Sequence, residues 1–385
     1  MTQYLPGLAG VPATKSNISE INGEQGKLYY RGYPIEQLAE NSSFEETTLL
    51  LLDGELPTKN ALNLFSEQLS ANNRVKYHIR ELMKTLPATG HPMEMLQTAV
   101  ASLGMFYPGN ECLTGGDACE DLNYIHNMTV KIIARMGSIV AMWEHIRNGY
   151  DPIPPRKDLS YAENFLYMLH GEEPDPELAR IMDVCLILHA EHTINASTFA
   201  VLVNGSTLAS PNTVIASAIG ALSGPLHGGA NQKVLEMLAE IGAPENADKY
   251  VEEKLQNKEK VWGMGHREYK TKDPRAIILQ KLVEKLLQNR GGNVNPLLET
   301  AMAVEKAAEE RLAHKGVYAN VDFYSGILYN EMGIPPDQFT AIFAMARSAG
   351  WMAHWREQLS DNRIFRPTQV YTGVGPRDYV RIENR

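Results

Sequence analysis

Apolar residues recur at helical spacing along most of the chain, and this periodicity restricts the possible folds more than any other feature of the sequence. A repeat of about 3.6 residues is typical of amphipathic and buried α-helices. Proline opens several of the segments, and proline or glycine stands at most of the breaks between them. We therefore expect a mainly α-helical, all-α protein, with helices at residues 95–105, 128–146, 162–169, 178–203, 211–222, 234–241, 250–255, 274–287, 296–313, 324–332 and 336–359.

Strand signals are concentrated near the start of the chain, at residues 18–21 and 27–30. The turn between them contains Asn22, Gly23 and Gly26, which are residue types that favour tight turns. These features predict a short N-terminal β-hairpin.

The distribution of charge changes along the chain. The segments between residues 247 and 315 are rich in charged side chains, whereas those between residues 178 and 222 are apolar. A smaller, more solvated unit is therefore expected to begin near Leu222 and to end near Asp322. With 385 residues, the chain is long enough for two domains or for one large domain with an insertion.

Net charge and cysteine content exclude several classes of protein. The formal net charge of -10 argues against nonspecific binding of nucleic acid or anionic membranes, because such binders carry an excess of basic side chains. The chain has only three cysteines, too few for a disulfide scaffold: Cys112, Cys119 and Cys185. Residues 1–10 do not read as a signal peptide, and no apolar run is long enough to span a membrane. We expect a cytoplasmic protein.

Three segments concentrate glycine, histidine or buried charge, and the first runs from Ser223 to Asn231. It places His227 directly before two glycines and an apolar helix. The ring of His227 is therefore expected near a helix N-terminus, where partial positive charge disfavours the imidazolium form. A neutral histidine there can donate a hydrogen bond to a developing oxyanion. The alternative is a capping turn that contains an incidental histidine.

The second segment lies between residues 263 and 275 and contains His266, Lys270 and Arg275. Its glycines leave the backbone free to approach a ligand closely. Asp273 precedes a proline and is suited to cap the next helix. The segment is either an anion-binding loop or a solvated basic face.

The third segment surrounds Asp322 with apolar and aromatic residues at the start of a predicted helix. The simplest interpretation of this aspartate, taken alone, is a helix N-cap. A partly desolvated carboxylate beside a histidine is instead suited to act as a general base, because burial raises its proton affinity.

Two further groups of residues invite a functional interpretation. His189, Glu191 and His192 are of metal-ligand type, but two histidines three residues apart do not match the i, i+4 pair of a helical zinc motif. A hydrogen-bonded polar site, or a pair of satisfied core histidines, is favoured over a metal. Arg347 lies in an apolar, aromatic helix and Arg366 in the extended segment after it. A buried arginine needs an anionic partner, which is either a ligand or a structural carboxylate.

Taken in chain order, these segments resemble the citrate synthase family over most of the chain. The resemblance is carried by motifs that occur in family order: residues 28–35, the turn at residues 54–57, His192 with residues 195–197, the three segments described above, and the helix that contains Arg347, Gly350 and Trp351.

The resemblance implies a large helical domain and a smaller, mobile helical domain, with the active site in the cleft. We place the large domain at residues 1–221 and 327–385, and the small domain at residues 222–326. Because members of the family are dimers or larger, a homodimer with a shared active site is expected.

The resemblance also implies roles for individual residues. The catalytic residues would be His227, His266 and Asp322. Oxaloacetate would be held by His192, Arg275, Arg347 and Arg366, the last of which would come from the partner subunit. The CoA phosphates would be bound by Lys270 and Lys315. The implied reaction condenses acetyl-CoA with oxaloacetate and water to give citrate and CoA, without a metal or a prosthetic group.

The chemistry of these side chains agrees with the implied roles. Asp322 would abstract a proton from the acetyl methyl group while neutral His227 donates to the enolate oxygen. His266 would polarise the keto carbonyl of oxaloacetate, and arginines would neutralise its carboxylates. Thioester hydrolysis would complete the turnover, with water excluded at the enol stage by closure of the small domain.

Three residues beside His266 depart from the types that the family commonly has there, and they are Trp262, Met264 and Glu268. They bear on acyl-chain preference and on CoA affinity. The nearest alternative activity is a 2-methylcitrate synthase that uses propanoyl-CoA with the same residues. Alternatives from other classes are a noncatalytic helical metabolite-binding or scaffold protein, and a metallohydrolase.

Overall fold

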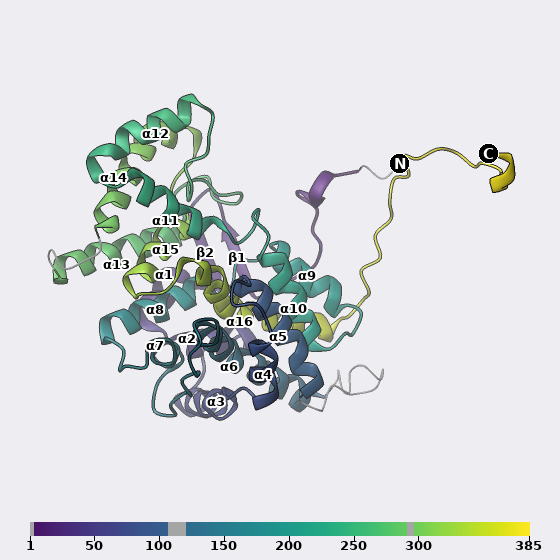
Figure 1. The fold of residues 1–385 in the computed structure, drawn as a ribbon, viewed down its shortest axis with the longest axis horizontal. Helices are drawn as coiled ribbons and strands as arrows, with labels where there is room; N and C mark the ends of the chain where they lie inside the picture. The colour runs from purple at the N-terminus through teal and green to yellow at the C-terminus, as the bar shows by residue number, and fades with distance from the viewer. Residues whose placement is uncertain (1–3, 107–120, 291–295) are drawn as a thin grey trace.

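The computed structural model describes residues 4–106, 121–290 and 296–385, and it confirms a mainly α-helical protein (Figure 1). Cys112 and Cys119 lie outside the described residues. The first helices are α1 (Ile35–Asn41), α2 (Phe44–Asp53), α3 (Lys59–Asn72), α4 (Tyr77–Lys84) and α5 (Pro92–Phe106). The next are α6 (Leu122–Arg147), α7 (Tyr161–His170), α8 (Pro176–His189), α9 (Ala196–Gly205) and α10 (Pro211–Leu222). The last are α11 (Ala230–Ile241), α12 (Ala247–Gln256), α13 (Pro274–Arg290), α14 (Leu297–Leu312), α15 (Val321–Glu331) and α16 (Phe339–Ser360).

The predicted N-terminal hairpin is confirmed and extended by a third strand. Strands β1 (Ser19–Asn22) and β2 (Lys27–Tyr30) pair antiparallel, with Ser19 opposite Tyr30. The short β3 (Tyr33–Pro34), which the sequence analysis did not predict, pairs with the other edge of β2. The hairpin brings Tyr30 into the core, where its side chain is fully buried.

The single helix predicted at residues 178–203 is wrong, because these residues form two helices. Helix α8 ends at His189 and α9 begins at Ala196. The side chain of Asn195 caps α9 by accepting a hydrogen bond from the backbone N–H of Thr198 (3.1 Å). Thr193 adopts a positive φ of 51°, which no helix accommodates. The apolar periodicity continues across this break and therefore conceals it.

Helix α16 lies at the centre of the molecule. Every residue from Phe339 to Trp355 is buried, as expected of a helix that is apolar on all sides. It contacts α2, α6, α8, α9 and α10, which surround it in Figure 1. In the figure, α11, α12 and α14 gather at the opposite end from α3 and α4. A polar side chain on α16 is therefore held among helices from both halves of the sequence.

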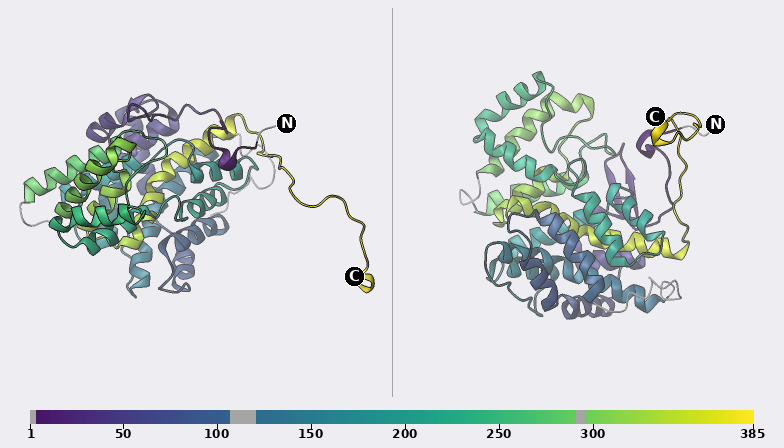
Figure 2. Two further views of the ribbon diagram at one scale, coloured as in Figure 1. Left: turned by 90° about the horizontal axis from the view of Figure 1, so that it is seen from above. Right: turned by 45° about the vertical axis from the view of Figure 1, so that its right-hand side comes forward.

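The chain after α16 leaves the body of the protein. Residues 362–365 still contact the end of α9, where Asn362 donates to the carbonyl of Ser206 (3.1 Å) and the ring of Phe365 packs edge-on against that of Phe199. Residues 366–385 are exposed, and the left view of Figure 2 shows the segment after α16 running away from the helices. Several of its large apolar side chains are exposed, namely Ile364, Val370, Tyr371, Val374 and Tyr379. Within the described residues, no helix is both long and apolar enough to cross a bilayer.

Helix α16 approaches the α8–α9 connection most closely at Gly350. The backbone N–H of Gly350 donates to the carbonyl oxygen of Ala190 (3.1 Å). A Cβ at Gly350 would lie 2.4 Å from that oxygen and 2.3 Å from Oε2 of Glu191. Glycine is required here because any side chain would push α16 away from the connection.

We expect Gly350→Ala to lower the free energy of unfolding by about 1–3 kcal/mol, the usual range for an overpacked core. The measurement is the urea midpoint of the variant at equilibrium. Gly375→Ala is the control, because a Cβ there meets nothing within 4 Å. Equal midpoints for the two variants would contradict this account of the contact.

Candidate active site

The connection between α8 and α9 carries the first predicted site residue, His192. Its ring is buried, and Nε2 lies 3.1 Å from the hydroxyl of Tyr269. The ring also packs edge-on against that of His266, with 5.1 Å between centroids. Burial lowers the pKa of His192 well below its usual value, and the positive charge of Arg275 lowers it further. His192 is therefore neutral and belongs to the same cluster as His266.

His227 lies at the N-terminus of a helix, as predicted, but the helix is α9 rather than the one that follows it in sequence. Its Nε2 accepts a hydrogen bond from the backbone N–H of Ser197 (3.2 Å) and lies 2.9 Å from the Ser197 hydroxyl. Because a backbone N–H can only donate, the neutral ring carries its proton on Nδ1. Burial lowers the pKa of His227 to about 4, with a further contribution from the positive charge of Arg347. The ring is a neutral donor at Nδ1.

His266 has the opposite tautomer. Its Nδ1 accepts hydrogen bonds from the backbone N–H groups of Glu268 (3.1 Å) and Tyr269 (3.5 Å), so the proton of the neutral ring is on Nε2. Burial, followed by the charge of Arg275, lowers the pKa of His266 to about 4. The two predicted catalytic histidines are thus neutral donors through different ring nitrogens.

The loop that holds His266 is joined to the segment before Asp322 by backbone hydrogen bonds. Gly265 donates to the carbonyl of Tyr318 (2.7 Å), and the backbone N–H of Asn320 donates to the carbonyl of Gly263 (2.9 Å). Gly263 has a φ of 78°, and a Cβ there would lie 2.7 Å from the ring of Phe323. Its glycine therefore serves close packing against α15 as well as the backbone conformation. The interpretation of this segment as a solvated basic face is wrong for its buried part.

Asp322 is not the cap of α15, so that simpler interpretation is wrong. Asn320 is the N-cap, and its side chain accepts from the backbone N–H of Asp322 (3.0 Å). The Oδ1 atom of Asp322 is buried and has no hydrogen-bond partner in the described protein. Burial raises the pKa of Asp322 to about 6, although the positive charges of Arg275 and Arg347 oppose the shift. A carboxylate in this state is suited to accept a proton near neutral pH.

Arg347 is an electrostatic neighbour of His192, His227 and Asp322. It is buried on α16, its Nε donates to the carbonyl of His189 (2.7 Å), and its guanidinium lies 4.7 Å from the ring centroid of Phe343. Within the described residues it makes no ion pair with a carboxylate. Burial lowers the pKa of Arg347 to about 10, which still leaves it charged. An arginine buried without a carboxylate is expected where an anionic ligand binds.

Arg275 is buried as well, but it has a structural partner. Its Nε and Nη2 donate to the two carboxylate oxygens of Asp273 (3.0 and 2.8 Å). The same carboxylate accepts from the backbone N–H of Arg275 (2.9 Å) at the start of α13, as its predicted capping role requires. The third nitrogen, Nη1, is the part of Arg275 left for a ligand.

The side chains of metal-ligand type at the α8–α9 connection make hydrogen bonds within the protein. Nδ1 of His189 is hydrogen-bonded to the carbonyl of Cys185 (2.7 Å). Oε1 of Glu191 lies 3.0 Å from Nε2 of His354 and accepts from the hydroxyl of Ser19 (2.9 Å). Glu191 thus ties the α8–α9 connection to α16 and to β1.

The remaining predicted residues lie outside this cluster. Arg366 is exposed on the segment that follows α16, away from the buried groups of its own chain. Lys270 and Lys315 are exposed, and their loops are adjacent, since a Cβ at Gly316 would lie 3.1 Å from the carbonyl oxygen of Lys270. The structure brings together His192, His227, His266, Arg275, Asp322 and Arg347.

Three residues at the site were not predicted as functional: Tyr30, Ser197 and Tyr269. The hydroxyl of Tyr30 lies 2.8 Å from the carbonyl of Glu191 and fixes the connection that carries His192. Ser197 also accepts a hydrogen bond from the indole N–H of Trp351 (3.2 Å). Each lies within a motif noted in the sequence, but no local pattern distinguishes a residue that orients a catalytic group from one that merely packs.

Comparison with known proteins agrees with this arrangement. The family model described as "Citrate synthase, C-terminal domain" matches residues 7–368. A citrate synthase of Acidithiobacillus ferridurans is 60% identical over 99% of this chain and 98% of its own, and one of Synechocystis sp. is 52% identical over 99% and 94%.

Solved structures of citrate synthases superpose on nearly the whole chain. The crystal structure of citrate synthase from Pyrobaculum aerophilum has a TM-score of 0.92 at 40% identity and covers 98% of this chain and 94% of its own. The ternary complex of carboxymethyl coenzyme A and oxaloacetate with the citrate synthase of Thermoplasma acidophilum has a TM-score of 0.89 at 32% identity, with 97% of each chain covered.

We expect the rings of His227 and His266 to stay neutral from pH 8 down to about pH 5, because both pKa values are lowered to about 4. Long-range nitrogen–proton spectra of protein labelled at histidine should show the Nδ1–H tautomer for His227 and the Nε2–H tautomer for His266. The variants His227→Gln and His266→Gln assign the signals. A protonation midpoint near 6.5 for either ring would contradict the prediction.

Proposed function

The chain belongs to the citrate synthase family and is an acyltransferase, and from that premise we propose that it condenses acetyl-CoA with oxaloacetate and water to give citrate and CoA. The observation that carries the proposal is one cluster: an unpartnered carboxylate of raised pKa, two neutral imidazoles of opposite tautomer, and a buried arginine without a carboxylate.

The first step is removal of a proton from the methyl group of acetyl-CoA. Asp322 accepts this proton through its carboxylate, which burial has made more basic. The electron pair moves onto the thioester oxygen, where the Nδ1–H of His227 donates a hydrogen bond to the developing enolate. A neutral donor suits this step because its own proton remains on the ring.

The second step joins the enol carbon to the keto carbon of oxaloacetate. The Nε2–H of His266 donates to the keto oxygen, which gains the negative charge as the carbon–carbon bond forms and takes the Nε2 proton. The ring is reprotonated from solvent, to which Asp322 returns the methyl proton. Arg347, the Nη1 atom of Arg275 and His192 hold the substrate carboxylates through charge-assisted hydrogen bonds. Water then hydrolyses the citryl thioester and releases CoA as the free thiol.

We further propose that two copies of the chain complete each site. Arg366 is exposed and lies on the segment after α16, which extends away from the helices in Figure 1, so this arginine is placed to serve the site of a partner subunit. The exposed apolar side chains of that segment also favour its packing against the surface of another subunit. The adjacent loops with Lys270 and Lys315 offer two positive charges for the CoA phosphates.

We also propose which groups the reaction uses, where in the cell it takes place and how the protein moves during turnover. The proposed chemistry uses side chains and the two substrates, without a metal or a prosthetic group, in the cytoplasm. Residues 222–326 form a small domain that closes over bound oxaloacetate and excludes water while the enol exists.

The experiment that tests the proposal compares release of free thiol from acetyl-CoA and from propanoyl-CoA, each with oxaloacetate. We expect the larger kcat/KM with acetyl-CoA. A clear preference for propanoyl-CoA would instead identify a 2-methylcitrate synthase. Absence of thiol release from both, in a chain that binds oxaloacetate, would favour a noncatalytic binding protein.

Asp322→Asn is expected to lower kcat by roughly 100-fold or more, because the amide cannot act as a general base. The same variant should bind oxaloacetate and unfold as the parent does, which titration calorimetry and urea denaturation would measure. Asp151→Asn is the control, since Asp151 carries an 84% exposed side chain. Unchanged turnover in Asp322→Asn would dismiss the proposed base.

A further inference from the structure

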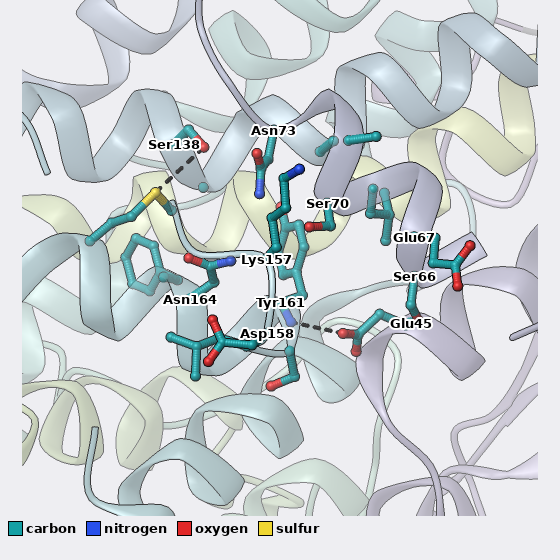
Figure 3. Close-up of a pocket in the computed structure, with 18 residues that line it drawn as sticks. Glu45, Ser66, Glu67, Ser70, Asn73, Ser138, Lys157, Asp158, Tyr161 and Asn164 are labelled. Carbon is teal, nitrogen blue, oxygen red and sulfur yellow. Dashed lines mark hydrogen bonds between the residues drawn. The ribbon is translucent and has the colours of Figure 1, made fainter. Parts of the chain in front are cut away.

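A cavity of about 470 Å³ lies apart from the residues of the proposed active site (Figure 3). Its walls come from helices α3, α6 and α7, from the start of α2, and from residues 157–160. None of the side chains given a role in the condensation lines it. The cavity therefore needs an explanation of its own.

Glu45 is the group that most needs a partner in this cavity. Its side chain is about nine-tenths buried, with a relative exposure of 6%. Oε1 accepts a hydrogen bond from the backbone N–H of Tyr161 (2.8 Å), as Figure 3 shows, but Oε2 is buried and has no partner in the described protein. A buried carboxylate oxygen without a donor is costly, so a donor is expected to reach it from the cavity.

A second polar atom in the cavity is also without a partner. The hydroxyl oxygen of Ser70, on α3, is buried and makes no hydrogen bond within the described residues. In Figure 3 its side chain extends from α3 towards the centre of the cavity, on the same side as Glu45. Two acceptors therefore face one space from two different helices, which suits a ligand with several donors on one atom.

The rest of the wall sets the character of that ligand. Most of the inner surface is apolar, with contributions from Leu69, Ala134, Phe165 and Met168. The lining also includes Lys157 and Glu67, whose side chains are exposed and of opposite charge. Asp158, another exposed lining residue, is paired with Arg156. The charge that remains for a ligand in the interior is the carboxyl group of Glu45.

We propose that this cavity binds a small organic cation, with a primary ammonium group at Glu45 and Ser70 and a compact apolar body against α6 and α7. An ammonium carries three donors, enough for Oε2 of Glu45 and the oxygen of Ser70 together. Burial raises the pKa of Glu45 to about 7, and the negative charge of Asp183 adds to the shift. A bound cation offsets both effects by stabilising the carboxylate.

The test compares three probes of nearly equal shape by titration calorimetry on the full chain: cyclohexylammonium, cyclohexanol and cyclohexanecarboxylate. The proposal expects the ammonium to bind most tightly, the alcohol more weakly and the carboxylate least. Equal binding of the ammonium and the carboxylate would overturn it, because the interior charge would then have no influence. No binding of any probe would also overturn it and would leave the cavity to water.

Variants locate the binding. Glu45→Gln keeps an acceptor for the backbone N–H of Tyr161 and removes the charge. It should therefore lower the affinity for cyclohexylammonium about tenfold or more, as loss of a charged hydrogen bond does. Ser70→Ala should weaken it less. Glu67→Gln is the matched control at an exposed lining residue and should leave the affinity unchanged. Full affinity in Glu45→Gln, or an equal loss in Glu67→Gln, would refute the assignment.

Discussion

The structure depends on a positive charge buried in the middle of its central helix. Arg347 lies on α16 among apolar and aromatic side chains, where its guanidinium contacts the carbonyl of His189 and the ring of Phe343. Removing a guanidinium from water is costly unless a negative charge accompanies it. The packing of the surrounding helices stabilises the fold enough to keep the charge buried. An anionic substrate would offset the free energy lost in burying it. The site is therefore arranged in advance to bind an anion.

Burial decides the charge state of the groups around Arg347, and the arginine charges modify it. The rings of His192 and His227 lose affinity for a proton first through burial and then through nearby arginine charges. Asp322 responds to burial in the opposite direction and gains proton affinity. Neutral donors and a basic carboxylate thus arise from one environment, because desolvation disfavours whichever form is charged. Backbone N–H groups then choose the tautomer of each imidazole, at Ser197 for one and at Glu268 for the other.

Hydrogen bonds outside the cluster hold its members in place. Glu191 joins His354 on α16 and Ser19 on β1, while Tyr30 on β2 holds the backbone of the same connection. The small sheet buries Leu28 and Tyr30 in the core and also orients the site. It fixes the break between α8 and α9 from which His192 faces His266.

The sequence by itself determined the helical fold, the hairpin and the residue types of the site, because apolar periodicity and turn chemistry are local properties. It could not place the break at residues 190–195, since apolar side chains continue through it. The segment around Asp322, taken alone, favoured that residue as a cap, a role that Asn320 takes in the structure. The pairing of His227 with α9, and the lack of a carboxylate ion pair for the buried Arg347 within the described residues, were decided only by tertiary structure. Proton affinity and tautomer depend on which distant groups exclude water from a side chain or donate to it, and no stretch of sequence contains that information.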